Sequence, residues 1–98
     1  EAVRLYCLAA EQGHAGAQFN LGAMFYHGEG VAKDYAEAVR LYRLSAAQGN
    51  AVAQFNLGDM FEKGPGVAQD RAEAIRWYRF AAAQGDANAQ NNLRRLGV

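Results

Sequence analysis

The sequence has little of four features that would narrow its chemistry: cysteine, proline, an excess of one charge, and long apolar runs. Its single cysteine, Cys7, excludes an intrachain disulfide framework and a zinc site built from cysteines. Ten basic residues balance ten acidic ones, so the chain lacks the basic excess typical of nucleic-acid binders. Apolar runs such as Gly22 to Tyr26 cover about five residues, against the roughly 20 that span a bilayer. We therefore expect no nucleic-acid partner and no membrane insertion.

What the sequence does contain is apolar surface. Of its 98 residues, 51% are hydrophobic and only one is proline, a composition typical of a folded protein rather than a disordered one. A chain of this length buries roughly 60 to 70% of its extended surface, which is enough for one continuous core. We expect a single domain over residues 1–98.

A repeat of 36 residues organises the whole chain, as the glycines Gly13, Gly49 and Gly85 illustrate. When residues 15–50 are laid over residues 51–86, 24 of the 36 positions are identical. The repeat predicts four pieces: a half repeat at 1–14, full repeats at 15–50 and 51–86, and a capping half repeat at 87–98.

Each unit contains two stretches with the apolar spacing of an amphipathic helix. Leu21, Met24 and Phe25 belong to the first helix of a unit, and Leu41 and Tyr42 belong to the second. The pattern predicts an all-α protein with no strand. The six expected helices cover about 1–12, 15–27, 35–48, 51–63, 71–84 and 87–96.

Polar residues and glycines mark where these helices begin and end. Asp34 with Glu37, repeated one unit later, forms a capping box, in which the aspartate accepts a backbone N–H and the glutamate reaches back. Gly49 followed by Asn50 predicts a very short turn between antiparallel helices. The paired glycines such as Gly28 and Gly30 are interpreted as turn residues, because no P-loop lysine follows and no strand precedes.

Two further glycines, Gly22 and Gly58, fall inside the first helix of each unit. A glycine there costs helix stability of about 1 kcal/mol relative to alanine. The cost is most easily offset if a neighbouring helix packs against the bare backbone. We therefore expect a close helix–helix contact at both positions.

The motif Ala-x-Ala-Gln-x-x-Leu-Gly-x-Met-Phe, then Gly-x-Gly-Val-x-x-Asp-x-x-x-Ala, then Tyr, Ala-Ala and Gly, occurs at 15–49 and again at 51–85. It resembles the Sel1-like repeat family, which is related to the tetratricopeptide repeat. The resemblance implies α/α hairpins stacked into a right-handed superhelix (a solenoid) whose first helices line the concave side. It also implies adaptor or scaffold work, mostly in bacterial proteins and in eukaryotic quality-control complexes. Leu41 departs from the pattern, since Trp77 shows the more typical aromatic residue.

Side chains able to carry chemistry are few. His14 lies at a predicted helix start, His27 at a helix end where a solvated tip is the simplest interpretation, and Cys7 at an exposed or half-exposed position. The acids of the capping boxes are accounted for by capping, and aromatic residues that recur with the repeat, such as Tyr42, are expected in the core. We expect no catalytic residue, no metal site and no cofactor, because nothing assembles a nucleophile, base or metal set.

One polar strip remains once the apolar stripe of each first helix is set aside. It follows the helical spacing i, i+4, i+7 and i+11. If the superhelix forms, the strip faces the concave groove, where side-chain amides suit the main chain of an extended peptide. The alternative is that these asparagines only cap or solvate the helices. The candidate partner-binding residues are Asn20, His27, Asn56, Asp59, Lys63 and Asn92.

The sequence therefore favours a protein–protein interaction module that binds a peptide or protein partner in its groove. Two alternatives stay open: a purely structural segment of a larger repeat protein, and an enzyme or small-molecule binder on the same fold. Binding of a peptide by the isolated chain would separate the first two. The third requires a deep pocket with a reactive group.

The two ends of the repeat array are expected to differ. At the C-terminal end Asn91, Arg94 and Arg95 replace the apolar or small residues of an interior unit, as in a solubilising cap. At the N-terminal end, residues 1–12 lack the helix that would cover the surroundings of Leu5. We expect Glu1 to be a boundary within a longer repeat protein, and the first helix to be a site of self-association.

Overall fold

The structure, a computed structural model, describes residues 2–64 and 66–98, with side chains from residue 4 onward; the expectation for Glu1 lies outside these ranges. The described residues form six α-helices and no strand. From the second helix on, both ends of each helix fall within one residue of the prediction. The helices are α1 (Ala2–Glu11), α2 (Ala15–His27), α3 (Tyr35–Ala47), α4 (Ala51–Lys63), α5 (Arg71–Ala83) and α6 (Ala87–Leu96).

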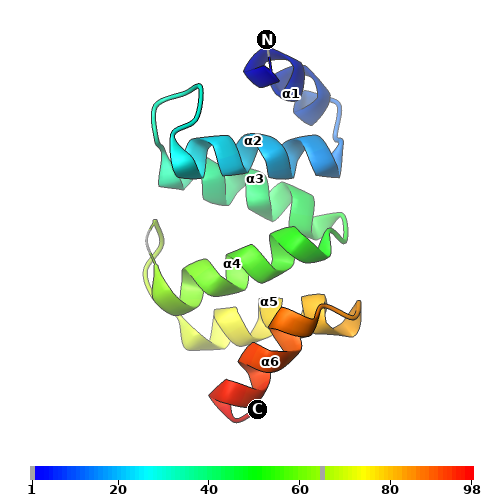
Figure 1. The fold of residues 1–98 in the computed structure, drawn as a ribbon, viewed down its shortest axis with the longest axis vertical. Helices are drawn as coiled ribbons and strands as arrows, with labels where there is room; N and C mark the ends of the chain where they lie inside the picture. Colours follow the sequence, from blue (N-terminus) through cyan, green and yellow to red (C-terminus); the bar gives the residue numbers. More distant parts are fainter. Residues whose placement is uncertain (1, 65) are drawn as a thin grey trace.

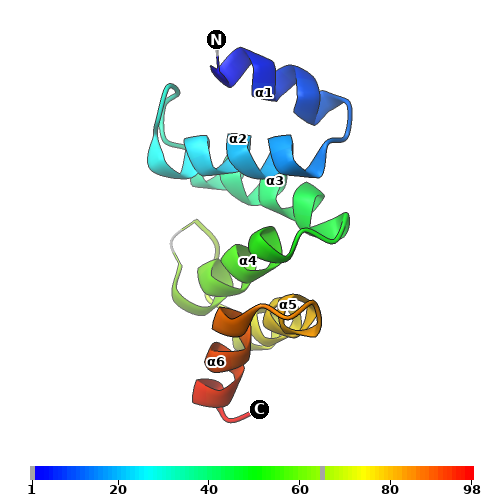
Figure 2. The same ribbon diagram turned by 45° about the vertical axis from the view of Figure 1, so that its right-hand side comes forward.

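The helices stack in chain order into an elongated molecule measuring 43 × 24 × 16 Å. Figure 1 shows α2, α4 and α6 on the near face, with α3 and α5 behind them. The view turned by 45° in Figure 2 shows the same progression from the N-terminus to the C-terminus. The main contacts join each helix to the next one along the chain, as expected for a repeat array. The predicted all-α solenoid is confirmed.

The short turns between units have the predicted chemistry. Gly49 and Gly85 have φ angles of 93° and 92°, in the left-handed region that glycine enters without strain. Directly after them, Asn50 and Asp86 cap the N-termini of α4 and α6, and each side chain accepts a hydrogen bond from a backbone N–H in the first turn. His14 stands at the corresponding place before α2, as predicted, but its side chain makes no capping hydrogen bond.

Only one of the two hydrogen bonds of each predicted capping box forms. The side chain of Asp34 accepts from the N–H of Glu37 at 3.1 Å. The glutamate does not reach back, because the N–H of Asp34 already donates to the carbonyl of Phe25 at 2.9 Å. The Glu37 carboxylate instead accepts from Arg40, with Nε at 2.9 Å. The Asp70 unit repeats the arrangement, so that part of the prediction is wrong in both boxes.

Each helix pair within a unit is held by a tyrosine ring lying on a bare glycine backbone. A Cβ atom added at Gly58 would lie 2.6 Å from the ring of Tyr78, and one added at Gly22 would lie 3.0 Å from the ring of Tyr42. Real Cβ atoms do not sit 2.6 Å from a ring carbon, so at Gly58 only glycine admits the tyrosine without a shift. The predicted close contact at both glycines is confirmed.

The core is continuous through the second unit and thinner in the first. Its larger cluster runs from α3 to α6 and includes Leu57 and Tyr78, both 0% exposed. The N-terminal cluster of buried residues consists of Ala10, Leu21 and Leu41.

The surfaces of the two ends differ as expected. In α6, Asn91, Arg94 and Arg95 are exposed. In α1, Leu5 and Leu8 are large hydrophobic side chains that are 63% and 49% exposed. Self-association through α1 stays a prediction.

Truncation of a core residue should therefore cost a large fraction of the stability. Leu57→Ala is expected to lower the free energy of unfolding by about 2 to 5 kcal/mol, because it leaves a cavity between packed helices. Val52 lies in the same helix and is 51% exposed, so Val52→Ala is the matched control and should change stability by less than about 0.5 kcal/mol. Chemical denaturation measures both. Equal effects of the two variants would show that Leu57 is not a core residue.

Candidate functional site

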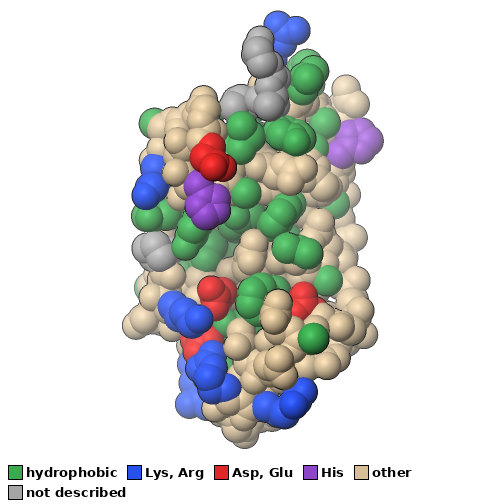
Figure 3. All heavy atoms as spheres, in the orientation of Figure 1, with side chains coloured by type: hydrophobic (Ala, Val, Ile, Leu, Met, Phe, Trp, Pro, Cys, Tyr) green, Lys and Arg blue, Asp and Glu red, His purple; other side chains and the backbone are tan. Residues whose placement is uncertain are grey.

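The six candidate residues lie on α2, α4 and α6, the helices of the face shown in Figures 1 and 3. Asn20, His27 and Lys63 are exposed. The other three candidates are half-buried, namely Asn56 and Asp59 on α4 and Asn92 on α6. Figure 3 shows hydrophobic side chains in the middle of the face and a group of acidic and basic side chains toward α4 and α6.

Three of the candidates share one hollow. His27, Asn56 and Asp59 line a hollow of about 180 Å³. Its other walls are Tyr26, Tyr42 and Met60. The hollow thus lies between the end of α2 and the middle of α4, at the contact between the two full units. Asn20, Lys63 and Asn92 are outside its lining.

A chain of polar contacts runs beside this hollow. Lys63 pairs with Asp59, with Nζ 3.1 Å from Oδ1. The hydroxyl of Tyr78 donates to Glu62 at 2.7 Å and lies 3.3 Å from Asp59. Arg95 of α6 completes the network, with Nη2 2.7 Å from a Glu62 carboxylate oxygen. The charged side chains of the face are thus held by one another and by a tyrosine that reaches them from α5.

Burial and hydrogen bonding shift the pKa values of Tyr42, Tyr78 and Glu62. Burial raises the pKa of Tyr42 to about 12, and it also raises the pKa of Tyr78, so both phenols keep their protons at neutral pH. Burial acts to raise the pKa of Glu62 too, but the hydrogen bonds from Tyr78 and Arg95 outweigh it and leave that pKa below 4.5. At neutral pH, Tyr78 is therefore a donor and Glu62 an acceptor.

Sequence reasoning missed several residues of the site. Glu62 and Tyr26 occupy equivalent positions of two units, just before the candidates Lys63 and His27. The signal was present, because this is one of the 12 positions in 36 at which the two full units differ. Tyr42 and Tyr78 lie in the core, as expected for aromatic residues that recur with the repeat, and are 3% and 0% exposed, but each also contributes to the polar face.

Within residues 2–64 and 66–98, no three His, Cys, Asp or Glu residues come together in a way that could hold a metal ion. None of the helices described in these ranges has both the length and the apolar character needed to cross a membrane.

Comparison with known proteins gives consistent matches. The model of the Sel1 repeat family matches residues 1–14, 15–50 and 51–86. The crystal structure of a Sel1 repeat protein from Oxalobacter formigenes is 44% identical, with a TM-score of 0.91, over 95% of this chain and 70% of that one. A protective antigen of uropathogenic Escherichia coli with an SLR fold is also 44% identical, with a TM-score of 0.89 over 98% of this chain. This chain covers only 22% of that antigen.

A more distant neighbour supports the fold alone. Helicobacter pylori cysteine rich protein B is 22% identical, with a TM-score of 0.88 over 93% of this chain and 68% of that one. No curated protein sequence matches the chain significantly.

The Glu62 network predicts a pH-dependent contribution to stability. A carboxylate whose folded-state pKa is lowered stabilises the fold above its unfolded pKa, and the contribution is lost as pH falls through the folded pKa. Glu62→Gln should lower the free energy of unfolding at pH 7 by about 1 kcal/mol. The effect is no larger because solvent around the exposed guanidinium of Arg95 screens its ion pair with Glu62. The difference from the wild type should shrink below pH 4.5. Denaturation at several pH values measures it.

Glu29 provides the control, because it is exposed in the connection between α2 and α3. Glu29→Gln should leave the pH profile of stability close to that of the wild type. If both variants gave the same profile, Glu62 would have no special place in the network.

Proposed function

This chain belongs to the Sel1 repeat family, and we propose that the face formed by α2, α4 and α6 binds an extended polypeptide of a partner protein. Sel1 repeat proteins are generally protein-interaction scaffolds and generally non-catalytic. The proposal assigns contacts with the peptide to Asn20, Asn56 and Asn92, with His27, Asp59 and Lys63 beside them. The binding module would be the single repeat domain of residues 1–98, with residues 87–98 as its polar cap.

The hollow between the two units is the observation that carries the proposal. It brings together a histidine, an asparagine and an aspartate with two aromatic walls, in about 180 Å³ of open space. The hollow has room for one side chain of a bound peptide, while the neighbouring asparagine amides form hydrogen bonds with the backbone of the peptide. An asparagine side chain offers both donors and an acceptor, which matches the N–H and C=O groups of an extended main chain.

The asparagines of the outer units support an extended ligand rather than a single bound side chain. Asn20, Asn56 and Asn92 recur at intervals of 36 residues, one on each of the three helices of the face. Among the described residues, no side-chain hydrogen bond joins Asn20 or Asn92 to the rest of the molecule, so both amides are available to a ligand.

The charged residues of the face favour a ligand of mixed character. Asp59 and Lys63 pair with each other, and Glu62 pairs with Arg95, so neither sign dominates the surface. Because the hydroxyl of Tyr78 lies within hydrogen-bond distance of both Asp59 and Glu62, the network is already ordered before a ligand binds. A preformed surface of this kind reduces the ordering cost of binding.

Replacing the three asparagines should weaken binding while leaving the fold intact. A peptide array probed with the chain identifies a bound peptide, whose affinity is then measured by calorimetry. Asn20→Ala, Asn56→Ala and Asn92→Ala combined should weaken that affinity at least about tenfold, since each lost hydrogen bond costs about 1 kcal/mol.

Asn91→Ala is the matched control, because Asn91 is exposed on α6 next to Asn92 but lies off the strip. It should change the affinity by less than about twofold, which is within 0.5 kcal/mol. An unchanged affinity in the triple variant, with its helical circular dichroism retained, would show that this face is not the binding surface.

A further inference from the structure

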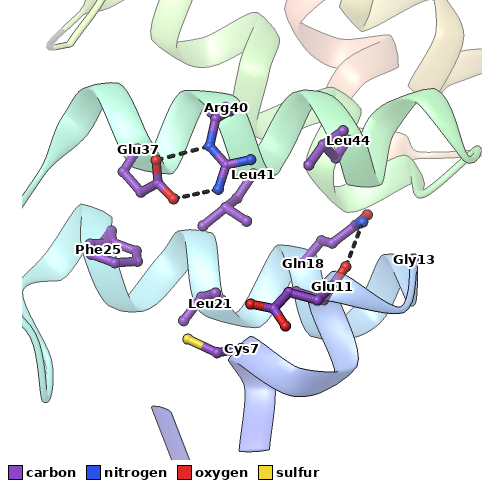
Figure 4. Close-up of a pocket in the computed structure, with 11 residues that line it drawn as sticks. Cys7, Glu11, Gly13, Gln18, Leu21, Phe25, Glu37, Arg40, Leu41 and Leu44 are labelled. Atoms are coloured by element: carbon purple, nitrogen blue, oxygen red, sulfur yellow. Dashed lines mark hydrogen bonds and ion pairs between the residues drawn. The ribbon is translucent and has the colours of Figure 1, made fainter. Parts of the chain in front are cut away.

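A second and larger hollow lies away from the polar face, between α1, α2 and α3. Its volume is about 460 Å³. Figure 4 shows Leu21 and Phe25 of α2, Leu41 and Leu44 of α3, and Cys7 of α1 around it. At its edge, the carboxylate of Glu37 accepts two hydrogen bonds from the guanidinium of Arg40, from Nε at 2.9 Å and from Nη2 at 2.5 Å (Figure 4). The hollow therefore combines apolar walls with a fixed cation.

The second unit contains the same hollow in a smaller form. Its lining includes Ala46, Gln54 and Arg76, which lie 36 residues after the lining residues Ala10, Gln18 and Arg40 of the first hollow. Its volume is about 300 Å³. The repeat thus allows a comparison of the same space, position by position, within one molecule.

The difference in size follows from three substitutions between the units. Cys7, Leu41 and Leu44 of the first hollow correspond to large side chains in the second. These counterparts are Arg43, Trp77 and Phe80. Each replacement removes side-chain volume from the first unit. The N-terminal hollow is therefore the space that an aromatic group and a second cation occupy one repeat later.

In the second unit that space holds an aromatic cluster capped by cations. The Trp77 ring is 5.6 Å from the Phe80 ring, and the guanidinium of Arg76 lies 4.8 Å from the centre of the indole. The guanidinium of Arg43 covers the ring of Phe61 at 5.2 Å. With these groups in place, Trp77 is 8% and Phe61 7% exposed.

The first unit has counterparts of the residues around Trp77, but it has no aromatic residue at the position of Trp77 itself. Arg40, anchored by Glu37, is the counterpart of Arg76 anchored by Glu73. Phe25 is the counterpart of Phe61, but it is only half-buried. Leu44, at the outer edge, is 42% exposed. A cation, its carboxylate anchor and an aromatic wall are thus arranged as they are around Trp77.

We propose that this hollow binds an aromatic side chain, preferentially the indole of a tryptophan, presented by a partner polypeptide. The ring would lie over Leu41 and against Phe25, beneath the guanidinium of Arg40. Burial of an aromatic side chain and its attraction to a guanidinium both favour the complex. Tryptophan is also among the residues most often found as anchors in protein interfaces.

An indole is favoured over a phenyl ring by the acceptors at the edge. In the second unit no hydrogen bond of regular geometry reaches the buried Nε1 of Trp77, but the indole lies close enough to Glu73 to help lower the pKa of that carboxyl. The first hollow is lined by Glu37, the counterpart of Glu73, and by Glu11, an exposed carboxylate where the second unit has Ala47. A bound indole therefore has the acceptor that corresponds to Glu73 and, in Glu11, a second carboxylate at the edge of the hollow.

The test uses a soluble analogue of the side chain and the protein's only thiol. N-acetyl-tryptophanamide is titrated into the ¹⁵N-labelled chain, with N-acetyl-leucinamide as the matched probe. The expected result is saturable shifts of the amide resonances of Cys7, Gln18 and Leu41, with a dissociation constant on the order of 1 mM. The leucine probe should bind at least about tenfold more weakly. Bound tryptophan probe should also slow the alkylation of Cys7 by iodoacetamide.

Variants that copy residues of the second unit separate this hollow from other binding. Leu41→Trp fills the space with the residue found there one repeat later and should weaken the probe at least about tenfold. Leu44→Phe narrows the hollow at its exposed edge, and it replaces Leu41→Trp in this test if that variant does not fold. Arg40→Gln should reduce the preference for tryptophan over leucine. The triple asparagine variant of the polar face should bind the probe normally, so failure of one proposal leaves the other standing.

Three outcomes would overturn the proposal: no saturable shift up to the solubility limit of the probe, shifts that cluster outside α1 to α3, or equal binding by the folded Leu41→Trp variant. A concentration-dependent dimer that the probe dissociates would also overturn it, since the occupant would then be a second copy of the chain. Sedimentation at several concentrations detects that dimer.

Discussion

The contact between a tyrosine ring and a glycine inside the neighbouring helix is the constraint on which the rest of this structure depends. It sets the separation of α2 and α3 through Gly22 and Tyr42, and of α4 and α5 through Gly58 and Tyr78. Glycine is a poor helix residue, and it lowers helix propensity by about 1 kcal/mol at each site. The protein accepts that cost because the bare backbone lets an aromatic ring bury completely.

The same tyrosines connect the core to the polar face. Their rings lie in the core, and their hydroxyl ends reach the helices that carry the candidate binding residues. Tyr78 donates to Glu62, which also binds Arg95 of the last helix, so α4, α5 and α6 meet at one carboxylate. The packing that defines the repeat thereby also fixes the charged side chains of the proposed binding surface.

The 36-residue repeat made most of the fold predictable, because the same caps, glycines and apolar stripe occur twice. The strip of asparagines was likewise visible in helical spacing. The grouping of His27 with Asp59 was not, because these residues come from different units and meet only when the units stack. The Glu62–Arg95 pair, 33 residues apart, escaped prediction for the same reason. The exchange of Trp77 for Leu41 was visible in the sequence, but only the packing around it shows an open hollow.

The most direct test of this account is the stability of three glycine-to-alanine variants measured by chemical denaturation. A Cβ atom would lie 2.6 Å from the tyrosine ring at Gly58, 3.0 Å at Gly22, and more than 4 Å from any neighbour at Gly16. Gly58→Ala should destabilise the protein by about 1 to 3 kcal/mol and Gly22→Ala by less, whereas Gly16→Ala should be neutral or stabilising by up to about 1 kcal/mol. If all three variants were equally stabilised by the gain in helix propensity, the tyrosine–glycine contact would not be the constraint described here.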